Sequence, residues 1–74
     1  MEVIMFTQDN CGKCVEAKQK LDDLEIEYKV VDIGNPDGRA EFLLRCKSME
    51  TPAFLVDGLE MRSVEQAIHR IMRG

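Results

Sequence analysis

Apolar positions along the chain follow two different periods, one typical of strands and one typical of helices. Val3 to Phe6 is a continuous apolar run with β-branched members, which predicts a central strand at about 2–6 that is covered on both faces. In the next segment apolar residues recur every three or four positions, which predicts an amphipathic helix over 12–24. The apolar stripe of this helix consists of Cys14, Ala17, Leu21 and Leu24. The spacing turns Cys14 towards the core.

The middle of the chain continues the alternation of strand and helix. Apolar residues within 27–33 indicate a second strand, and a strand, helix, strand order of this length implies a right-handed parallel crossover. Asn35 followed by Pro36 is typical of an N-cap with proline at the first helical position. A second helix is therefore expected over 36–47.

The last third of the chain predicts a hairpin and a final helix. Asp57-Gly58 is a signal for a type I′ turn between strands at 53–56 and 59–61, so this half of the sheet is expected to be antiparallel. A Ser-x-x-Gln capping box then opens a helix over 64–72. The apolar stripe of that helix consists of Val64, Ala67, Ile68, Ile71 and Met72.

The predicted order of elements is βαβαββα, an α/β fold with a four-stranded mixed sheet and helices on both faces. We expect a single domain over 1–74, because the chain has no internal repeat and no linker long enough to divide it. With 45% hydrophobic and 32% charged residues, the composition is that of a globular protein rather than a disordered one. We expect the protein to be a monomer.

Charge and hydropathy exclude two classes of partner. The net charge of -4 and the lack of a basic stripe argue against nucleic acid, whose binding depends on Lys and Arg. The longest apolar runs have four residues, far too few to span a membrane. Glu2 also stands where a secretory signal would be basic. The expected location is the cytoplasm.

The stretch TQDNCGKCVEAK carries the main candidate chemistry, because it places Cys11 and Cys14 where the first strand ends and the first helix begins. Unpaired N–H groups and the macrodipole at this helix end are expected to lower the pKa of a thiol. Lys13 adds to this effect and Asp9 opposes it. A Cys-x-x-Cys motif in a βαβ unit indicates redox chemistry, although the same spacing also occurs in metal sites.

Because Cys11 is expected to be more exposed than Cys14, the two cysteines are expected to have different roles. Cys11, at the mouth of the helix, attacks a substrate disulfide as a thiolate, and Cys14 then attacks Cys11 to release the reduced substrate. Gly12 leaves the attacking sulfur approachable. The product is an oxidised Cys11–Cys14 pair, and no cofactor is required.

Two other hypotheses compete with dithiol chemistry. Cys46 and His69 would complete a Cys₃His set of zinc-like ligands, but their separation along the chain argues against it. Cys46 is expected to pack the second helix and His69 to lie on the surface of the third. A cluster of iron and sulfur bridging two copies is another form of the metal hypothesis. A further hypothesis is a redox-fold adaptor that binds partners without turnover.

The stretches TQDNCGKCVEAK and TPAFLVDG, with the order of elements around them, resemble the thioredoxin superfamily and specifically the short glutaredoxin-like proteins. The resemblance covers nearly the whole chain. It implies that Pro52 is cis and lies against the cysteine pair, and that Thr51 binds an extended substrate by strand addition. Substrate binding is assigned to Thr51, Pro52 and Lys13. Lys18 matches a lysine common in the family.

Departures from the family pattern concern the electron donor. Glutathione-using members carry Pro-Tyr between the cysteines and Gly-Gly after the fourth strand begins, whereas this chain has Gly12-Lys13 and a lone Gly58. The resemblance therefore implies a thiol–disulfide oxidoreductase for protein or small-molecule disulfides that takes electrons from a thioredoxin reductase, with glutathione as the alternative donor. Asp9 is expected to be an ordinary capping residue, and a role as proton acceptor for Cys14 stays open.

Overall fold

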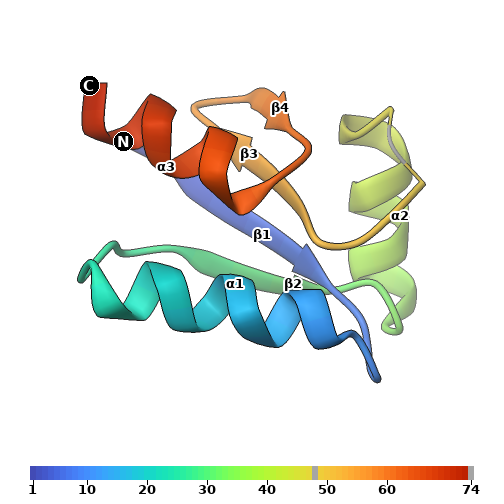
Figure 1. The fold of residues 1–74 in the computed structure, drawn as a ribbon. Helices are drawn as coiled ribbons and strands as arrows, with labels where there is room; N and C mark the ends of the chain where they lie inside the picture. Colours follow the sequence, from blue (N-terminus) through green and yellow to red (C-terminus); the bar gives the residue numbers. More distant parts are fainter. Residues whose placement is uncertain (48, 74) are drawn as a thin grey trace.

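Four strands form one mixed sheet in the computed structural model, which describes residues 1–47 and 49–73 (Figure 1). The strands are β1 (Val3–Thr7), β2 (Lys29–Asp32), β3 (Ala53–Val56) and β4 (Leu59–Met61). Their order across the sheet is β2-β1-β3-β4, in which β1 runs parallel to β2 and antiparallel to β3, and β3 runs antiparallel to β4. The predicted fold class is confirmed.

Three helices cover the two faces of this sheet, and they are α1 (Gly12–Asp23), α2 (Pro36–Arg45) and α3 (Val64–Arg73). α1 and α3 lie on one face, while α2 lies on the other (Figure 1). Side chains of a strand alternate between faces, so Met5 packs with α1 and α3, and Phe6 packs with α2. The rings of Phe6 and Phe42 lie 5.3 Å apart between centroids. β1 is therefore buried from both sides.

Local signals in the sequence explain where several elements begin. The Asn35 side chain accepts a hydrogen bond from the backbone N–H of Asp37 at 2.9 Å, which caps α2 as predicted. Asp57 and Gly58 have φ of 51° and 84°, both in the left-handed region that a type I′ turn requires. The hairpin prediction is confirmed.

The capping box before α3 forms only in part. The Ser63 hydroxyl accepts from the backbone N–H of Gln66 at 3.2 Å, as expected. The Gln66 side chain, however, accepts from the backbone N–H of Arg62 at 3.2 Å and not from that of Ser63. The reciprocal bond therefore closes one residue earlier than in a full capping box.

Two positions expected in apolar stripes are exposed instead. Leu24 is 45% exposed because α1 ends at Asp23 and the chain turns through Glu25, whose φ is 57°. Met72, in the last turn of α3, is 59% exposed.

α2 is shorter than predicted, and its first turn packs closely against the sheet. The helix ends at Arg45 and not at residue 47, because Cys46 already has extended backbone with φ of -118° and ψ of 139°. At the other end, a Cβ on Gly38 would lie 2.2 Å from the carbonyl oxygen of Asp32, so only glycine permits this approach of α2 to β2. Within residues 1–47 and 49–73, no helix has the length and apolar character needed to cross a bilayer.

Candidate functional site

The two cysteines of the Cys-x-x-Cys motif lie at the N-terminus of α1, directly after the loop that leaves β1. Asn10 turns the chain with φ of 60°, and Cys11 follows as the N-cap residue. Cys11 and Cys14 form a disulfide across a Cα–Cα distance of 5.2 Å. The backbone N–H of Cys14 donates to the Cys11 sulfur at 3.1 Å. The Cys11 sulfur thus takes the place of the usual N-cap oxygen.

The two sulfurs differ in their exposure. Cys14 is 2% exposed, because the apolar stripe of α1 faces the sheet, as the helical spacing predicted. Cys11 is partly exposed at the end of the helix. An incoming disulfide therefore meets Cys11 first.

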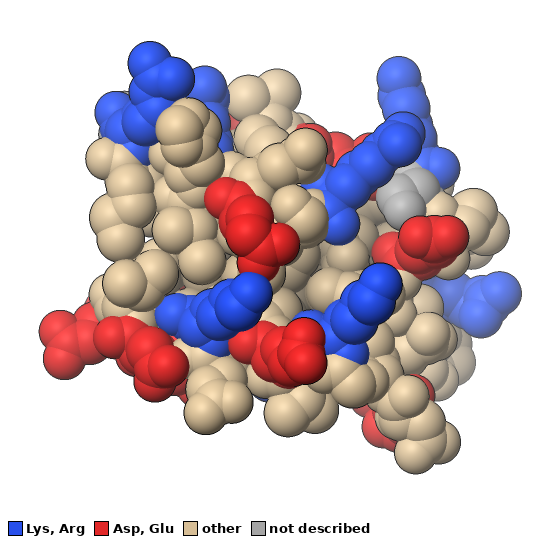
Figure 2. All heavy atoms as spheres, viewed as in Figure 1, with Lys and Arg blue, Asp and Glu red and all other residues tan. Residues whose placement is uncertain are grey.

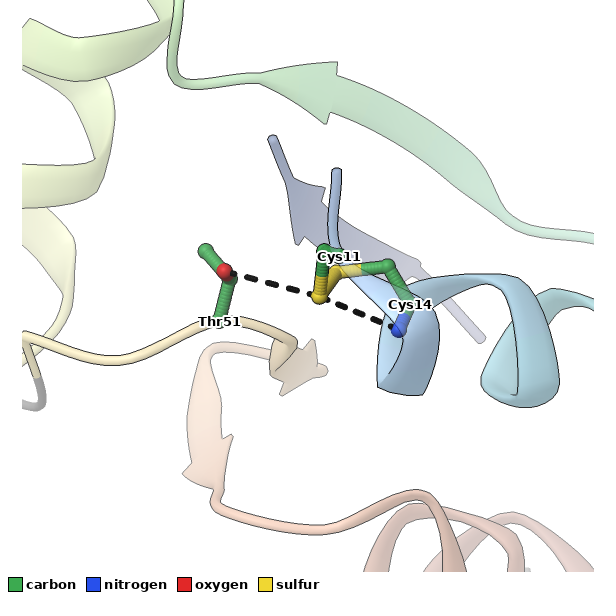
Figure 3. The surroundings of a disulfide bond; sticks show 3 residues. All are labelled: Cys11, Cys14 and Thr51. Atoms are coloured by element: carbon green, nitrogen blue, oxygen red, sulfur yellow. Dashed lines mark hydrogen bonds between the residues drawn. A yellow bond between two sulfur atoms is a disulfide. The ribbon is translucent and has the colours of Figure 1, made fainter. Parts of the chain in front are cut away.

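The loop before β3 faces the cysteine pair. The Thr51–Pro52 peptide bond is cis, as the family resemblance implied. The Thr51 hydroxyl points across the gap towards the pair and donates a hydrogen bond to the Cys11 sulfur at 3.8 Å (Figure 3). Ala53, directly after the proline, pairs with Phe6 of β1 and fixes the loop beside the site. Cys11 and Cys14, from the start of α1, are thus brought together with Thr51 from the loop before β3.

Two surface hollows flank the cysteine pair. One, of about 360 Å³, is lined by Lys13, Met49, Glu50, Thr51, Pro52 and Arg62. This hollow contains all three residues to which substrate binding was assigned. It also contains Arg62, which the sequence did not single out, because its place beside Pro52 depends on how the turn between β4 and α3 folds back. We call this hollow the proline-side groove.

The second hollow lies on the β2 side of the pair and has a volume of about 500 Å³. Asp9, Lys18 and Asp32 contribute its charged groups, together with exposed Val15 and Val30. Among the described residues, no hydrogen bond joins Asp9 to either sulfur. The open role of Asp9 as a proton acceptor thus has no direct contact to support it.

Cys46 and His69 do not join the site. Cys46 is 7% exposed and packs with Phe42 on the α2 face of the sheet, whereas Cys14 lies on the α1 face. Burial, together with the nearby Glu60 carboxylate, raises the pKa of the Cys46 thiol to about 11. His69 is exposed on α3. In the described part of the chain, no three His, Cys, Asp or Glu side chains gather as metal ligands do, and the metal hypothesis has no support.

The fold and the placement of the pair define the thioredoxin-like class of redox proteins, with a Cys-x-x-Cys motif at the start of the first helix and a cis-proline loop facing it. The sequence model of the Glutaredoxin family matches residues 3–60. The chain belongs to the glutaredoxin family. Family and fold together support a thiol–disulfide oxidoreductase.

Solved structures agree with this fold. The thioredoxin-like protein BC3987 superposes with a TM-score of 0.81 at 23% identity, covering 97% of each chain. The holo form of glutaredoxin C1 from Populus tremula x tremuloides superposes with a TM-score of 0.71 at 22% identity. The match covers 97% of this chain and 75% of the glutaredoxin C1 chain. Buckwheat glutaredoxin in complex with glutathione superposes with a TM-score of 0.72 at 20% identity, and the match covers 97% of this chain and 69% of the buckwheat chain. No curated protein matches the chain in sequence.

The Thr51 hydroxyl is expected to stabilise the Cys11 thiolate in the reduced protein, since it already donates to that sulfur. Thr51→Val removes the donor, and alkylation of Cys11 by iodoacetamide at pH 6 to 7 should slow about three- to tenfold. Thr51→Ser keeps the hydroxyl and should stay near the wild-type rate. At high pH, where the thiol is fully ionised in all three proteins, the rates should converge. A loss for Thr51→Val that persists at high pH would contradict the hydrogen-bond explanation.

The raised pKa of Cys46 predicts a pH dependence of stability. Above the ordinary pKa of a thiol, the unfolded state loses the Cys46 proton while the folded state keeps it up to about pH 11. The folded state then binds more protons, so stability falls as pH rises through this window. Urea unfolding of the oxidised protein between pH 7 and 10 should show a steeper loss for the wild type than for Cys46→Ala. If the free energy of unfolding fell equally with pH in both proteins, the Cys46 thiol would have the same pKa in the folded and unfolded states, which would contradict this prediction.

Proposed function

We propose that this protein reduces disulfides in proteins or small molecules through the Cys11–Cys14 dithiol, and so acts as an electron carrier. The observation that carries the proposal is the position of the Cys11 sulfur. This sulfur is partly exposed, accepts from Cys14 N–H at 3.1 Å and faces the Thr51 hydroxyl, while Cys14 is buried behind it. A partly exposed sulfur with donors around it is the kind of cysteine that reacts as a thiolate.

In the first step the reduced protein attacks its substrate. The Cys11 thiolate attacks one sulfur of the substrate disulfide, a mixed disulfide forms, and the other substrate sulfur leaves as a thiolate that takes a proton from water. The backbone N–H of Cys14 and the N-terminus of α1 stabilise the negative charge on Cys11 before the attack. Thr51 adds a donor from the opposite side.

In the second step the inner cysteine releases the product. Cys14 gives up its proton and attacks Cys11, which frees the second substrate thiol and leaves the Cys11–Cys14 disulfide. The Cα–Cα distance of 5.2 Å lies within the range that a disulfide needs, so closure requires little backbone movement. Two electrons pass from the dithiol to the substrate, and two thiols appear on the substrate side.

Backbone groups beside the cis-proline supply a place for the substrate. Thr51 precedes Pro52 at the start of β3, and an extended segment would pair with the backbone of Thr51 by strand addition next to Cys11. Lys13, in the same groove, contributes a cation to this surface. Thr51, Pro52 and Lys13 are the proposed substrate-binding residues.

The proposed electron donor is a thioredoxin reductase. Lys13 stands where glutathione-using relatives are expected to carry Tyr, and a lone Gly58 stands where they are expected to carry Gly-Gly. Arg62 lines the proline-side groove together with Lys13. Glutathione is the alternative donor, because a structural neighbour of this chain, buckwheat glutaredoxin, binds glutathione. We also propose that residues 1–74 act as one monomeric domain in the cytoplasm, where a reducing environment would keep the pair available for turnover.

Cysteine variants separate the two proposed roles. In an insulin-reduction assay with dithiothreitol, Cys11→Ser should fall to the rate of the protein-free mixture, because the attacking thiol is gone. Reduced Cys14→Ser, mixed with insulin after dithiothreitol has been removed, should accumulate a mixed disulfide with insulin that mass spectrometry detects, because the resolving thiol is gone. The control Cys46→Ala should keep the activity, since this thiol is buried on the other face of the sheet. Wild-type activity in Cys11→Ser would refute the proposed function.

The electron donor is tested by recycling the oxidised protein. NADPH with a thioredoxin reductase should restore the free thiols of Cys11 and Cys14 within minutes at micromolar enzyme. Glutathione with glutathione reductase should do so at least about tenfold more slowly, which corresponds to about 1.4 kcal/mol in the barrier. The same preparation with Cys14→Ser serves as a control without a dithiol to recycle. Faster recycling by glutathione would reverse the assignment of the donor.

A further inference from the structure

The proline-side groove contains two cations that form no ion pair with another residue of the described part of the chain. Lys13, from the first turn of α1, and Arg62, from the turn between β4 and α3, are both exposed and both line this groove. Within residues 1–47 and 49–73, the ion pairs join Lys20 to Glu65 and Arg45 to Glu2 and Glu41, and none includes Lys13 or Arg62. Both cations are therefore available to a ligand.

Neighbouring charges explain why these cations are left over. Glu65, in the first turn of α3, is held by Lys20 at 2.7 Å, and the pair raises the pKa of Lys20 and lowers that of Glu65. Glu65 is thereby removed as a partner for Arg62. Figure 2 shows acidic and basic side chains alternating along α1, and basic side chains near the end of α3, which carries Arg70 and Arg73 in its last turn. The charged lining of the groove is completed by one carboxylate, that of Glu50.

The balance of charge reverses on the other side of the cysteine pair. The hollow on the β2 side carries two carboxylates, Asp9 and Asp32, and one cation, Lys18. Cys11 lines that hollow and is joined to the proline-side groove through its contact with Thr51. A substrate therefore meets an excess of positive charge on one side of the reacting sulfur and an excess of negative charge on the other. Such a gradient favours one orientation of a charged segment.

The groove also extends beyond the space next to the cis-proline. Lys13, Pro52 and Arg62 also line a third hollow of about 260 Å³, which continues along α1 to Glu16 and Lys20 and reaches Glu65 of α3. The two hollows share these three residues, so together they form a continuous track past both cations. A track of this kind can hold an extended polypeptide, which is longer than a tripeptide such as glutathione.

We propose that the preferred substrate is a polypeptide disulfide whose reacting cysteine has an acidic residue beside it, with Lys13 and Arg62 binding that carboxylate. This inference rests on the proposed function, because the same exchange follows binding: Cys11 joins the substrate cysteine, the partner sulfur leaves as a thiol, and Cys14 completes the two-electron reduction. Arg62 is a specificity-determining residue, since it touches the flanking residue and not the reacting sulfurs. Exposed ionic contacts of this sort act mainly on the rate of encounter.

The test uses the full-length protein, reduced and freed of reductant, and a set of symmetric peptide disulfides. The peptides differ only at one residue beside the cysteine, which is Glu, Gln or Lys, and the set is made twice, for the position before and the position after the cysteine. The second-order rate constant of oxidation is measured by the loss of protein thiols at low salt. At least one set should give the order Glu, Gln, Lys, with about fivefold between Glu and Gln. About 0.5 M NaCl should remove most of the difference, because exposed charges are screened.

Matched variants assign the preference to the groove. Arg62→Gln should bring the ratio of the Glu and Gln peptides close to one, and Arg70→Gln, which removes the same charge from α3 outside the groove, should leave that ratio unchanged. Equal rates for the three peptides in both sets, or a ratio that Arg62→Gln does not change, would overturn the acidic preference alone. Glutathione disulfide reacting faster than every peptide would overturn the choice of a polypeptide. No reaction with any peptide would overturn the proposed function together with this inference.

Discussion

The burial of β1 on both faces is the constraint on which the site depends. Its five residues are all buried, between α2 on one face and α1 with α3 on the other. β1 also pairs with β2 on one edge and with β3 on the other. The loop after Thr7 consequently emerges from the most restrained part of the molecule. Cys11, the N-cap residue of α1, comes only four residues later, so its position depends on β1 as well as on its own contacts to Cys14 and Thr51.

The same strand places the second half of the site. Phe6, near the end of β1, pairs with Ala53, the residue after the cis-proline. A single antiparallel register therefore fixes the distance between the cysteine pair and Thr51, which lie 40 positions apart in sequence. The backbone proposed to bind substrate and the sulfur proposed to react are thus held close together through β1. Changes in the packing of β1 should alter this geometry more than changes in the exposed loop residues.

Sequence patterns predicted the elements well because each one carried its own local signal. The bounds of β3 and β4 were as predicted, since Asp57-Gly58 fixes the hairpin and therefore both strands. The inward position of Cys14 followed from the spacing of α1. Local patterns gave the wrong burial where the exposure of a side chain depends on packing against another element. Periodicity assigns Leu24 and Met72 to an apolar stripe, but whether another layer covers them depends on where the helices end against the sheet.

Arg62 shows the same limit for the site. It lies 48 positions after Cys14 and belongs to no motif, so only the fold of the turn between β4 and α3 reveals that it shares a groove with Lys13 and Pro52. Arg62 also forms no ion pair with any other described residue, which the sequence could not show, because Glu65 is instead held by Lys20. The sequence shows which residues are charged. The net charge available in a groove also depends on which of those residues form ion pairs with their neighbours, and only the folded structure shows this.

The separation of the third cysteine keeps the exchange within one pair. Three thiols in a small reduced protein permit three different disulfides, and scrambling would leave an unproductive product. The sheet prevents this, because Cys46 lies on the α2 face while Cys14 lies on the α1 face. Burial adds a chemical barrier, since a thiol with a pKa of about 11 is almost fully protonated at neutral pH and is a poor nucleophile. Cys14 is buried too, at 2% exposed, but it lies within disulfide distance of Cys11 at the start of α1. Position in the fold, and not burial alone, therefore separates the proposed reactive pair from Cys46.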